Sequence, residues 1–109
     1  MERIYNKLVR DNIPDIIMEK GETPVTRVLS EVEYRVELET KLGEEYHEVL
    51  GTTTSDERIE ELADMIEIII SLAKLENKSL DEVIAVAFKK RLKRCGFDRK
   101  IYLEKVIEK

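Results

Sequence analysis

Glycine, proline, cysteine and tryptophan are scarce in this 109-residue chain, with four, two, one and none, respectively. Few turn-forming residues favour a helical protein with few loops. The single cysteine, Cys95, cannot form an internal disulfide, so we expect a reducing, cytoplasmic location. The first residues lack the apolar core of a signal peptide. Residues 65–75, the longest apolar stretch, fall short of the roughly 20 residues of a membrane span, so we expect no membrane partner.

Acidic and basic residues are distributed unevenly along the chain. Residues 30–86 hold 16 acids and 5 bases, a net charge of −11, whereas residues 87–109 hold 3 acids and 9 bases, a net charge of +6. The overall charge of −5 argues against a nucleic-acid partner. Hydrophobic residues make up 42%, enough for the core of one domain over residues 1–109. Because a chain this short buries only about two thirds of its unfolded surface, we expect a homodimer or homotetramer.

Three hydroxyl residues are each followed three positions later by glutamate, which is the capping-box signal of a helix start. They are Ser30 with Glu33, Thr54 with Glu57, and Ser79 with Glu82. The boxes predict three helices, over residues 31–50, 56–76 and 80–94. We expect the first to end at Gly51 in a left-handed cap and the third near Gly96. A shorter helix is predicted over residues 14–20, because proline suits a first turn and Gly21 an exit.

Two segments alternate apolar and polar residues and are rich in β-branched side chains, residues 24–29 and 100–106. We expect them to pair as a small two-stranded β element beside an all-α four-helix bundle. Residues 102–108 are equally compatible with a frayed helix.

Two acids interrupt the apolar face of the first long helix. On a helical wheel Glu45 lies in the middle of the stripe formed by Leu38, Leu42 and Val49, and Glu48 lies at its edge. An acid therefore occupies a core position.

The second long helix repeats this feature. Its apolar face comprises Met65, Ile68, Leu72 and Leu75. One turn earlier, Glu61 and Asp64 occupy the same face. A second apolar face comprises Leu62, Ile66, Ile69 and Ala73. The helix is therefore expected to be buried on two sides, in a bundle centre or an oligomer interface.

A short connection between antiparallel helices would bring these four acids together. Crowded carboxylates remain ionised only when a cation compensates them. Oxygen ligands suit Mg²⁺, with Mn²⁺ as the alternative, and such ions keep open positions for water and phosphates. The simpler reading is a solvated acidic face, because 18 of the 109 residues are glutamate. The placement of both pairs in apolar stripes favours the metal site.

The third long helix carries basic residues at its end. Its inner face, Leu80, Val83, Ile84 and Ala87, continues to Arg91 and Arg94, with Lys90 beside them. Bases at a helix end also complement the helix dipole, which is the structural explanation. Nine bases in the last 23 residues exceed that need, so we expect Lys90, Arg91 and Arg94 to bind phosphate oxygens.

Three single residues have a simpler interpretation. His47 lies opposite the apolar stripe and is expected at the surface. Cys95 is expected to be a packing residue, since no second histidine is present to activate it. Gly43, inside a helix, suggests close approach of a ligand or a neighbouring helix.

Residues 41–48, Lys-Leu-Gly-Glu-Glu-Tyr-His-Glu, and 60–67, Glu-Glu-Leu-Ala-Asp-Met-Ile-Glu, resemble a known two-part signature. It is Glu-Glu-x-x-Glu followed by Glu-x-x-Asp, found in the MazG superfamily of all-α nucleoside triphosphate pyrophosphatases. Residues 5–14 and 94–104 resemble the phosphoribosyl-ATP-pyrophosphohydrolase-like branch of this superfamily. The members of this branch are described as predicted house-cleaning enzymes. The resemblance covers nearly the whole chain.

This resemblance implies a four-helix core built up by dimerisation. The residues that match the magnesium ligands are Glu45, Glu48, Glu61 and Asp64. Glu44 matches the first glutamate of the motif but lies outside the stripe, so we expect it beside the ligands. Lys90 and Arg94 match a Lys-x-x-x-Arg pattern that holds phosphates in relatives. Asn12 stands where a lysine is expected, and Cys95 where a glycine is expected.

The implied activity is Mg²⁺-dependent hydrolysis of a nucleoside triphosphate between the α and β phosphates, on non-standard nucleotides. Glu44 or Glu48 would serve as the base, and Lys7 and Arg10 are further candidates for phosphate contact. Phosphoribosyl-ATP is the alternative substrate. A di-iron bundle needs Glu-x-x-His on two helices, and only Glu44 with His47 fits. The non-enzymatic alternative is a helical oligomerisation module.

Overall fold

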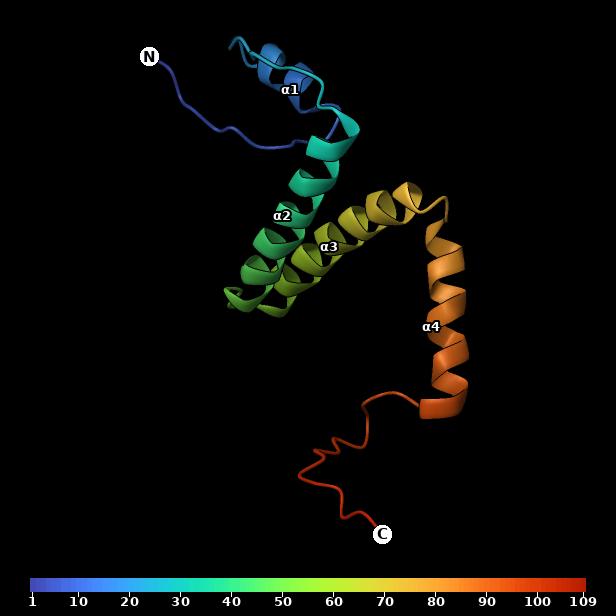
Figure 1. Cartoon of the computed structure of the whole chain (residues 1–109). Coiled ribbons are helices and arrows are strands. Elements are labelled where there is room, and N and C mark those ends of the chain that lie inside the picture. Colours follow the sequence, from blue (N-terminus) through green and yellow to red (C-terminus); the bar gives the residue numbers. More distant parts are fainter.

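The computed structural model describes residues 1–109 and contains four α-helices and no strand. The helices are α1 (Ile13–Glu19), α2 (Glu31–Leu50), α3 (Ser55–Leu75) and α4 (Leu80–Arg94). The expected all-α class is confirmed, and each helix lies within one residue of its predicted bounds (Figure 1). No helix combines the length and the apolar character that crossing a membrane requires.

Side-chain caps begin the three long helices. At Ser30 and Ser79 both halves of the predicted capping box form, so the serine hydroxyl accepts the N3 amide and the N3 glutamate accepts the serine amide. Thr54 accepts the Glu57 amide, but the Glu57 carboxylate instead accepts the amide of Thr53, at 3.2 Å. The predicted box at Thr54 is therefore only half formed, because the Glu57 carboxylate bonds the amide of Thr53 and not that of Thr54.

The helix exits differ in backbone conformation. Gly21, after α1, has a φ of 83°, the left-handed conformation that glycine adopts without strain. Gly51, after α2, has a φ of −86° and a ψ of −2°, so the predicted left-handed cap at this position is wrong. Its amide bonds the carbonyls of His47 and Glu48, and that right-handed ending needs no glycine. Cys95, after α4, has a φ of 63° and a ψ of −164°, a region that favours glycine.

The core lies between α2 and α3, which run antiparallel as a hairpin (Figure 1). Leu38, Ile68 and Ala73 are buried, at 3%, 7% and 8% exposure. The predicted stripe residues Leu42 and Val49 are half-buried beside them. Both predicted stripes therefore face each other across the hairpin.

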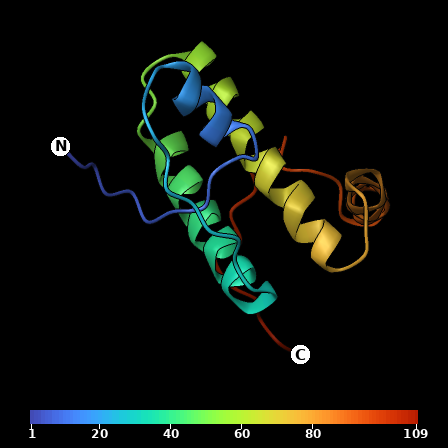
Figure 2. The same cartoon turned by 90° about the horizontal axis from the view of Figure 1, so that it is seen from above.

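Helix α4 stands away from the hairpin. It packs only against α3, and residues 81–94 are exposed (Figure 2). The radius of gyration is 18.9 Å, whereas a compact chain of this length has about 13 Å. The predicted inner face of α4 is uncovered, with Val83 37% and Ile84 39% exposed. Within one chain the four helices do not close into a bundle.

The predicted two-stranded β element is wrong. Residues 24–29 and 100–106 adopt no strand conformation, and no ladder joins them. The two segments lie at opposite ends of the molecule, one before α2 and the other beyond α4 (Figure 1). A strand needs a neighbour for its backbone groups, and neither segment has one within the chain.

Candidate metal site

Three of the four predicted carboxylate ligands lie together. Glu45 is in the last turns of α2, and Glu61 and Asp64 are in the first turns of α3. The four-residue connection, residues 51–54, reverses the chain and places these turns side by side. Oxygen atoms of the three side chains lie within 4.8 Å of one another, and each residue is half-buried. We call this group the carboxylate cluster.

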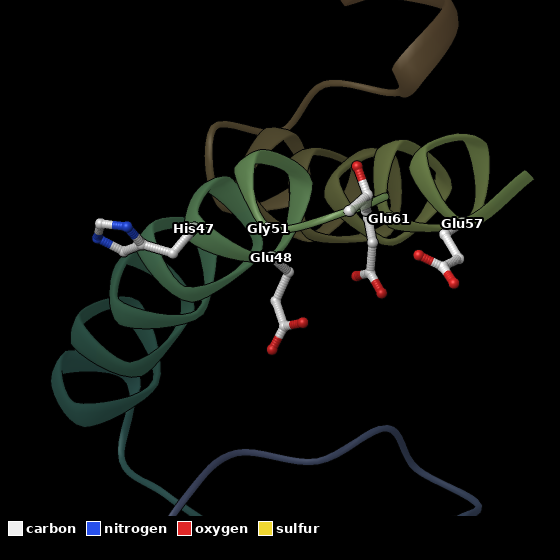
Figure 3. A pocket seen from close by; sticks show the side chains of 6 residues that line it. His47, Glu48, Gly51, Glu57 and Glu61 are labelled. Atoms are coloured by element: carbon white, nitrogen blue, oxygen red, sulfur yellow. The ribbon is translucent and has the colours of Figure 1, made fainter. Parts of the chain in front are cut away.

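Glu48, the fourth predicted ligand, lies at the rim. It is exposed and its carboxylate is outside the carboxylate cluster, although its charge acts on Glu45. It lines a polar, open pocket of about 330 Å³ beside the hairpin connection. Figure 3 shows Glu48, Glu57 and Glu61 pointing to the same side, while the ring of His47 points away from them.

Glu57 is a pocket residue that the sequence analysis assigned only to capping. It lines the pocket together with His47, Glu48, Gly51, Thr52 and Glu61. Its position one turn before Glu61 on the same helix is a sequence signal from which this role could have been predicted. Because Glu57 accepts hydrogen bonds from Thr53, its carboxylate has a structural role at the start of α3.

Glu45 contributes a buried oxygen to the carboxylate cluster. Its Oε2 atom is buried and has no hydrogen-bond partner. Burial, followed by a side-chain hydrogen bond with Glu61 and by the charges of Asp64, Glu61 and Glu48, raises the pKa of Glu45 to about 7. A buried oxygen without a donor is expensive unless a proton or a cation satisfies it. All-oxygen donors of this kind fit Mg²⁺ or Mn²⁺.

Arg10 reaches the carboxylate cluster from the N-terminal segment. Its Nη2 atom donates to Oδ1 of Asp64 at 2.7 Å, across 54 positions of sequence. The sequence predicts phosphate contact for Arg10 and does not predict this ion pair with Asp64. No local pattern identifies such a partner, because the chain path between residues 10 and 64 decides it.

The other predicted phosphate ligands form no ion pair with the carboxylates. Lys90, Arg91 and Arg94 are exposed on α4 and form no salt bridge. The guanidinium of Arg91 lies 5.8 Å from the centre of the Phe88 ring, and the ammonium of Lys7 lies 5.6 Å from the Tyr5 ring. Within one chain these bases do not complete a site with the carboxylate cluster.

Four further residues that the sequence singled out have the following positions. Glu44 is exposed and outside the carboxylate cluster, as its position on the wheel indicated. His47 is exposed, as predicted, but Cys95 is also exposed, so its assignment to packing is wrong for the single chain. A Cβ atom built at Gly43 would meet nothing within 4 Å, so no helix of the same chain approaches this glycine.

Comparison with known proteins identifies one region of similarity. A protein of Mycolicibacterium smegmatis, described only as uncharacterized, is 46% identical over 54 residues. The matched region is 50% of this chain and spans about half, 55%, of the relative. No family model and no solved structure matches the chain. The relative's name states no activity, so a functional assignment depends on the residues of this chain.

Proposed function

We propose that this protein is a Mg²⁺-dependent nucleoside triphosphate pyrophosphohydrolase of the MazG type, acting on non-standard nucleotides. It would cleave between the α and β phosphates and release the nucleoside monophosphate and pyrophosphate. The main support is the carboxylate cluster, with the buried and unpartnered Oε2 of Glu45 at its centre. Its members occupy the positions that the Glu-Glu-x-x-Glu and Glu-x-x-Asp signature assigns to metal ligands.

Each residue of the site has a defined task in this proposal. Glu45, Glu61 and Asp64 would hold the ion, which supplies charge neutralisation and acidification of water when bound. Glu48, exposed at the rim of the pocket, would accept a proton from the attacking water at its carboxylate. Glu44 is the alternative base, but it lies outside the carboxylate cluster.

Basic residues would bind the polyphosphate. Lys90, Arg91 and Arg94 of α4 carry no counter-charge and are available to phosphate oxygens. Lys7 and Arg10 are the candidates from the N-terminal segment. Phosphoribosyl-ATP carries the same triphosphate group, so it remains the alternative substrate within this reaction class.

The proposal is tested with purified protein, Mg²⁺ and a panel of standard, deoxy and damaged nucleoside triphosphates plus phosphoribosyl-ATP. The wild type should release pyrophosphate from one or more of them. Glu61→Gln removes one ligand charge at nearly constant shape, so pyrophosphate release should be lost while the helical circular dichroism spectrum is kept. Glu60→Gln is the matched control, because Glu60 is exposed and outside the carboxylate cluster. An active E61Q variant would contradict the assignment.

We also propose that the protein is a homodimer or homotetramer. Only three of 109 residues are buried in one chain, and 25 large hydrophobic residues are exposed. On the second face of α3, for which the sequence predicts burial, Ala73 is buried and Ile69 is half-buried, whereas Leu62 is 41% and Ile66 is 47% exposed. A second copy of the chain carries the same exposed apolar faces and could cover them. Its position would also determine where the bases of α4 lie relative to the carboxylate cluster.

The same exposed surface supports a second candidate, a non-catalytic helical oligomerisation module. In that case the acids would serve solubility, and Mg²⁺ would not bind. A thermal melt with and without Mg²⁺ separates the two candidates. An increase in Tm that E61Q abolishes favours the enzyme, and an unchanged Tm favours the module.

A further inference from the structure

Arg10 is the only cationic residue that contacts the carboxylate cluster. The other ion pairs of the chain join residues outside it: Arg3 with Glu22, Arg27 with Glu33, Arg35 with Glu76, and Lys78 with Glu82. The 2.7 Å contact of Arg10 with Asp64 therefore supplies the positive charge nearest to three crowded carboxylates. A divalent cation bound by the same carboxylates would lie close to this guanidinium, and the two charges repel.

The geometry of the Arg10–Asp64 ion pair suits a guanidinium that can separate from its carboxylate. A single nitrogen of Arg10 bonds a single oxygen of Asp64, whereas a guanidinium that fixes a carboxylate rigidly forms two parallel bonds. The Arg10 side chain is 60% exposed and that of Asp64 is 41% exposed. Breaking the contact therefore leaves both groups in reach of water and uncovers no buried charge.

The backbone of Arg10 is held independently of its side chain. Its carbonyl accepts a hydrogen bond from the amide of Ile13 at 3.0 Å, in the turn that begins α1. Residues before this turn have no regular structure, and chain in the blue of the N-terminal residues crosses the side toward which the pocket carboxylates point (Figure 3). The side chain can thus change partner while the turn keeps it near the site.

We propose that Arg10 is a resident counter-cation of Asp64, which a divalent ion displaces when it binds the carboxylate cluster. This inference rests on the proposed cation site. Arg10 stabilises the ion-free protein by neutralising part of the cluster and lowers the affinity for the ion by competing with it. A residue that positioned Asp64 for the ion would have the opposite effect on affinity.

The test is isothermal titration calorimetry of the full chain with Mg²⁺ alone. In Arg10→Gln the competing charge is absent, so Mg²⁺ should bind about five- to ten-fold more tightly than in the wild type. Arg10→Lys keeps the charge and should bind Mg²⁺ like the wild type. Arg3→Gln is the matched control, since it removes an N-terminal arginine whose partner, Glu22, is outside the cluster.

Each other outcome overturns the inference. Unchanged or weaker Mg²⁺ binding by R10Q, with binding intact in the wild type, rejects Arg10 as a competitor and leaves the cation site standing. Tighter binding by R10K to the same extent as by R10Q rejects charge as the cause. If neither the wild type nor R10Q binds Mg²⁺ or Mn²⁺, the cation site itself fails, and this inference fails with it.

Discussion

Glu45 places a carboxylate at a core position of the fold. It occupies a core position of α2, between Leu42 and Val49, and its carboxylate is held against Glu61 and Asp64. A leucine there would pack better, because burying a carboxylate costs free energy that burying a methyl group does not. A bound cation or proton offsets this cost. The position is therefore expected to trade stability of the ion-free protein for ion binding.

The raised pKa of Glu45 predicts a pH dependence. Its folded pKa of about 7 lies above the ordinary value of 4.5, so the folded state binds the proton more tightly than the unfolded state. This contribution to stability is fully present below pH 4.5 and is lost as pH rises through 7. In a metal-free buffer, Glu45→Gln should reduce the stability lost between pH 5 and pH 8 by about 1–2 kcal/mol, because glutamine does not titrate.

Urea denaturation at pH 5 and pH 8 with a chelator measures this difference. Glu44→Gln is the matched control, since Glu44 is adjacent but lies outside the carboxylate cluster. An E45Q profile that parallels the wild-type profile would show that Glu45 does not carry the dependence.

At the scale of the element, the helices begin where hydroxyl side chains cap them. Ser30 and Glu33 bond reciprocally at the start of α2. Glu33 also bonds Arg27. The hydrogen bond from Arg27 is the largest cause, and those from Ser30 come next, in lowering the pKa of Glu33 to about 2. The start of α2 therefore keeps its charged cap through the neutral range. Helix α2 carries Glu45, so its start contributes to holding the site.

Removal of the Ser30 hydroxyl should destabilise the hairpin. Ser30→Ala leaves the Glu33 amide without its side-chain acceptor, which costs about 1 kcal/mol of the free energy of unfolding. Ser30→Asp supplies another acceptor and should restore most of the loss. Thermal and urea denaturation followed by circular dichroism measures both variants. Equal stability of S30A and the wild type would indicate that Glu33 with Arg27 suffices to begin the helix.

At the scale of the whole molecule, a single chain leaves much of its apolar surface exposed to solvent. The hairpin of α2 and α3 buries three residues, and α4 extends away from it with its apolar face exposed. Exposed apolar surface on this scale is typical of a subunit and not of a stable monomer. The bases of α4 and the carboxylate cluster also do not meet within one chain.

The proposed assembly can be tested by mass. Sedimentation equilibrium should give at least twice the chain mass of 12.8 kDa. Ile66→Glu places a charge in the second apolar face of α3 and should shift the protein to a monomer. Ser55→Glu is the control, since Ser55 is an exposed polar residue at the start of the same helix and belongs to neither apolar face. A monomeric wild type would contradict the assembly.

The sequence alone largely determined the helices of the chain and the face of each helix on which a residue lies. Helix bounds followed from caps and periodicity, as for α2 and α4, because capping bonds join residues three positions apart. The same periodicity placed Glu45, Glu61 and Asp64 on inward faces, and the short connection made their approach predictable.

Only the tertiary structure decided the contacts between distant segments. The pairing of Arg10 with Asp64, the exposed position of α4 and the absence of a strand pair between residues 24–29 and 100–106 have no local signal. A segment with strand propensity forms a strand only when another strand pairs with it. Two distant charged residues form an ion pair only when the path of the chain brings them together. Sequence determined which faces carry charge and apolar groups, whereas the path of the chain decided which of those faces meet.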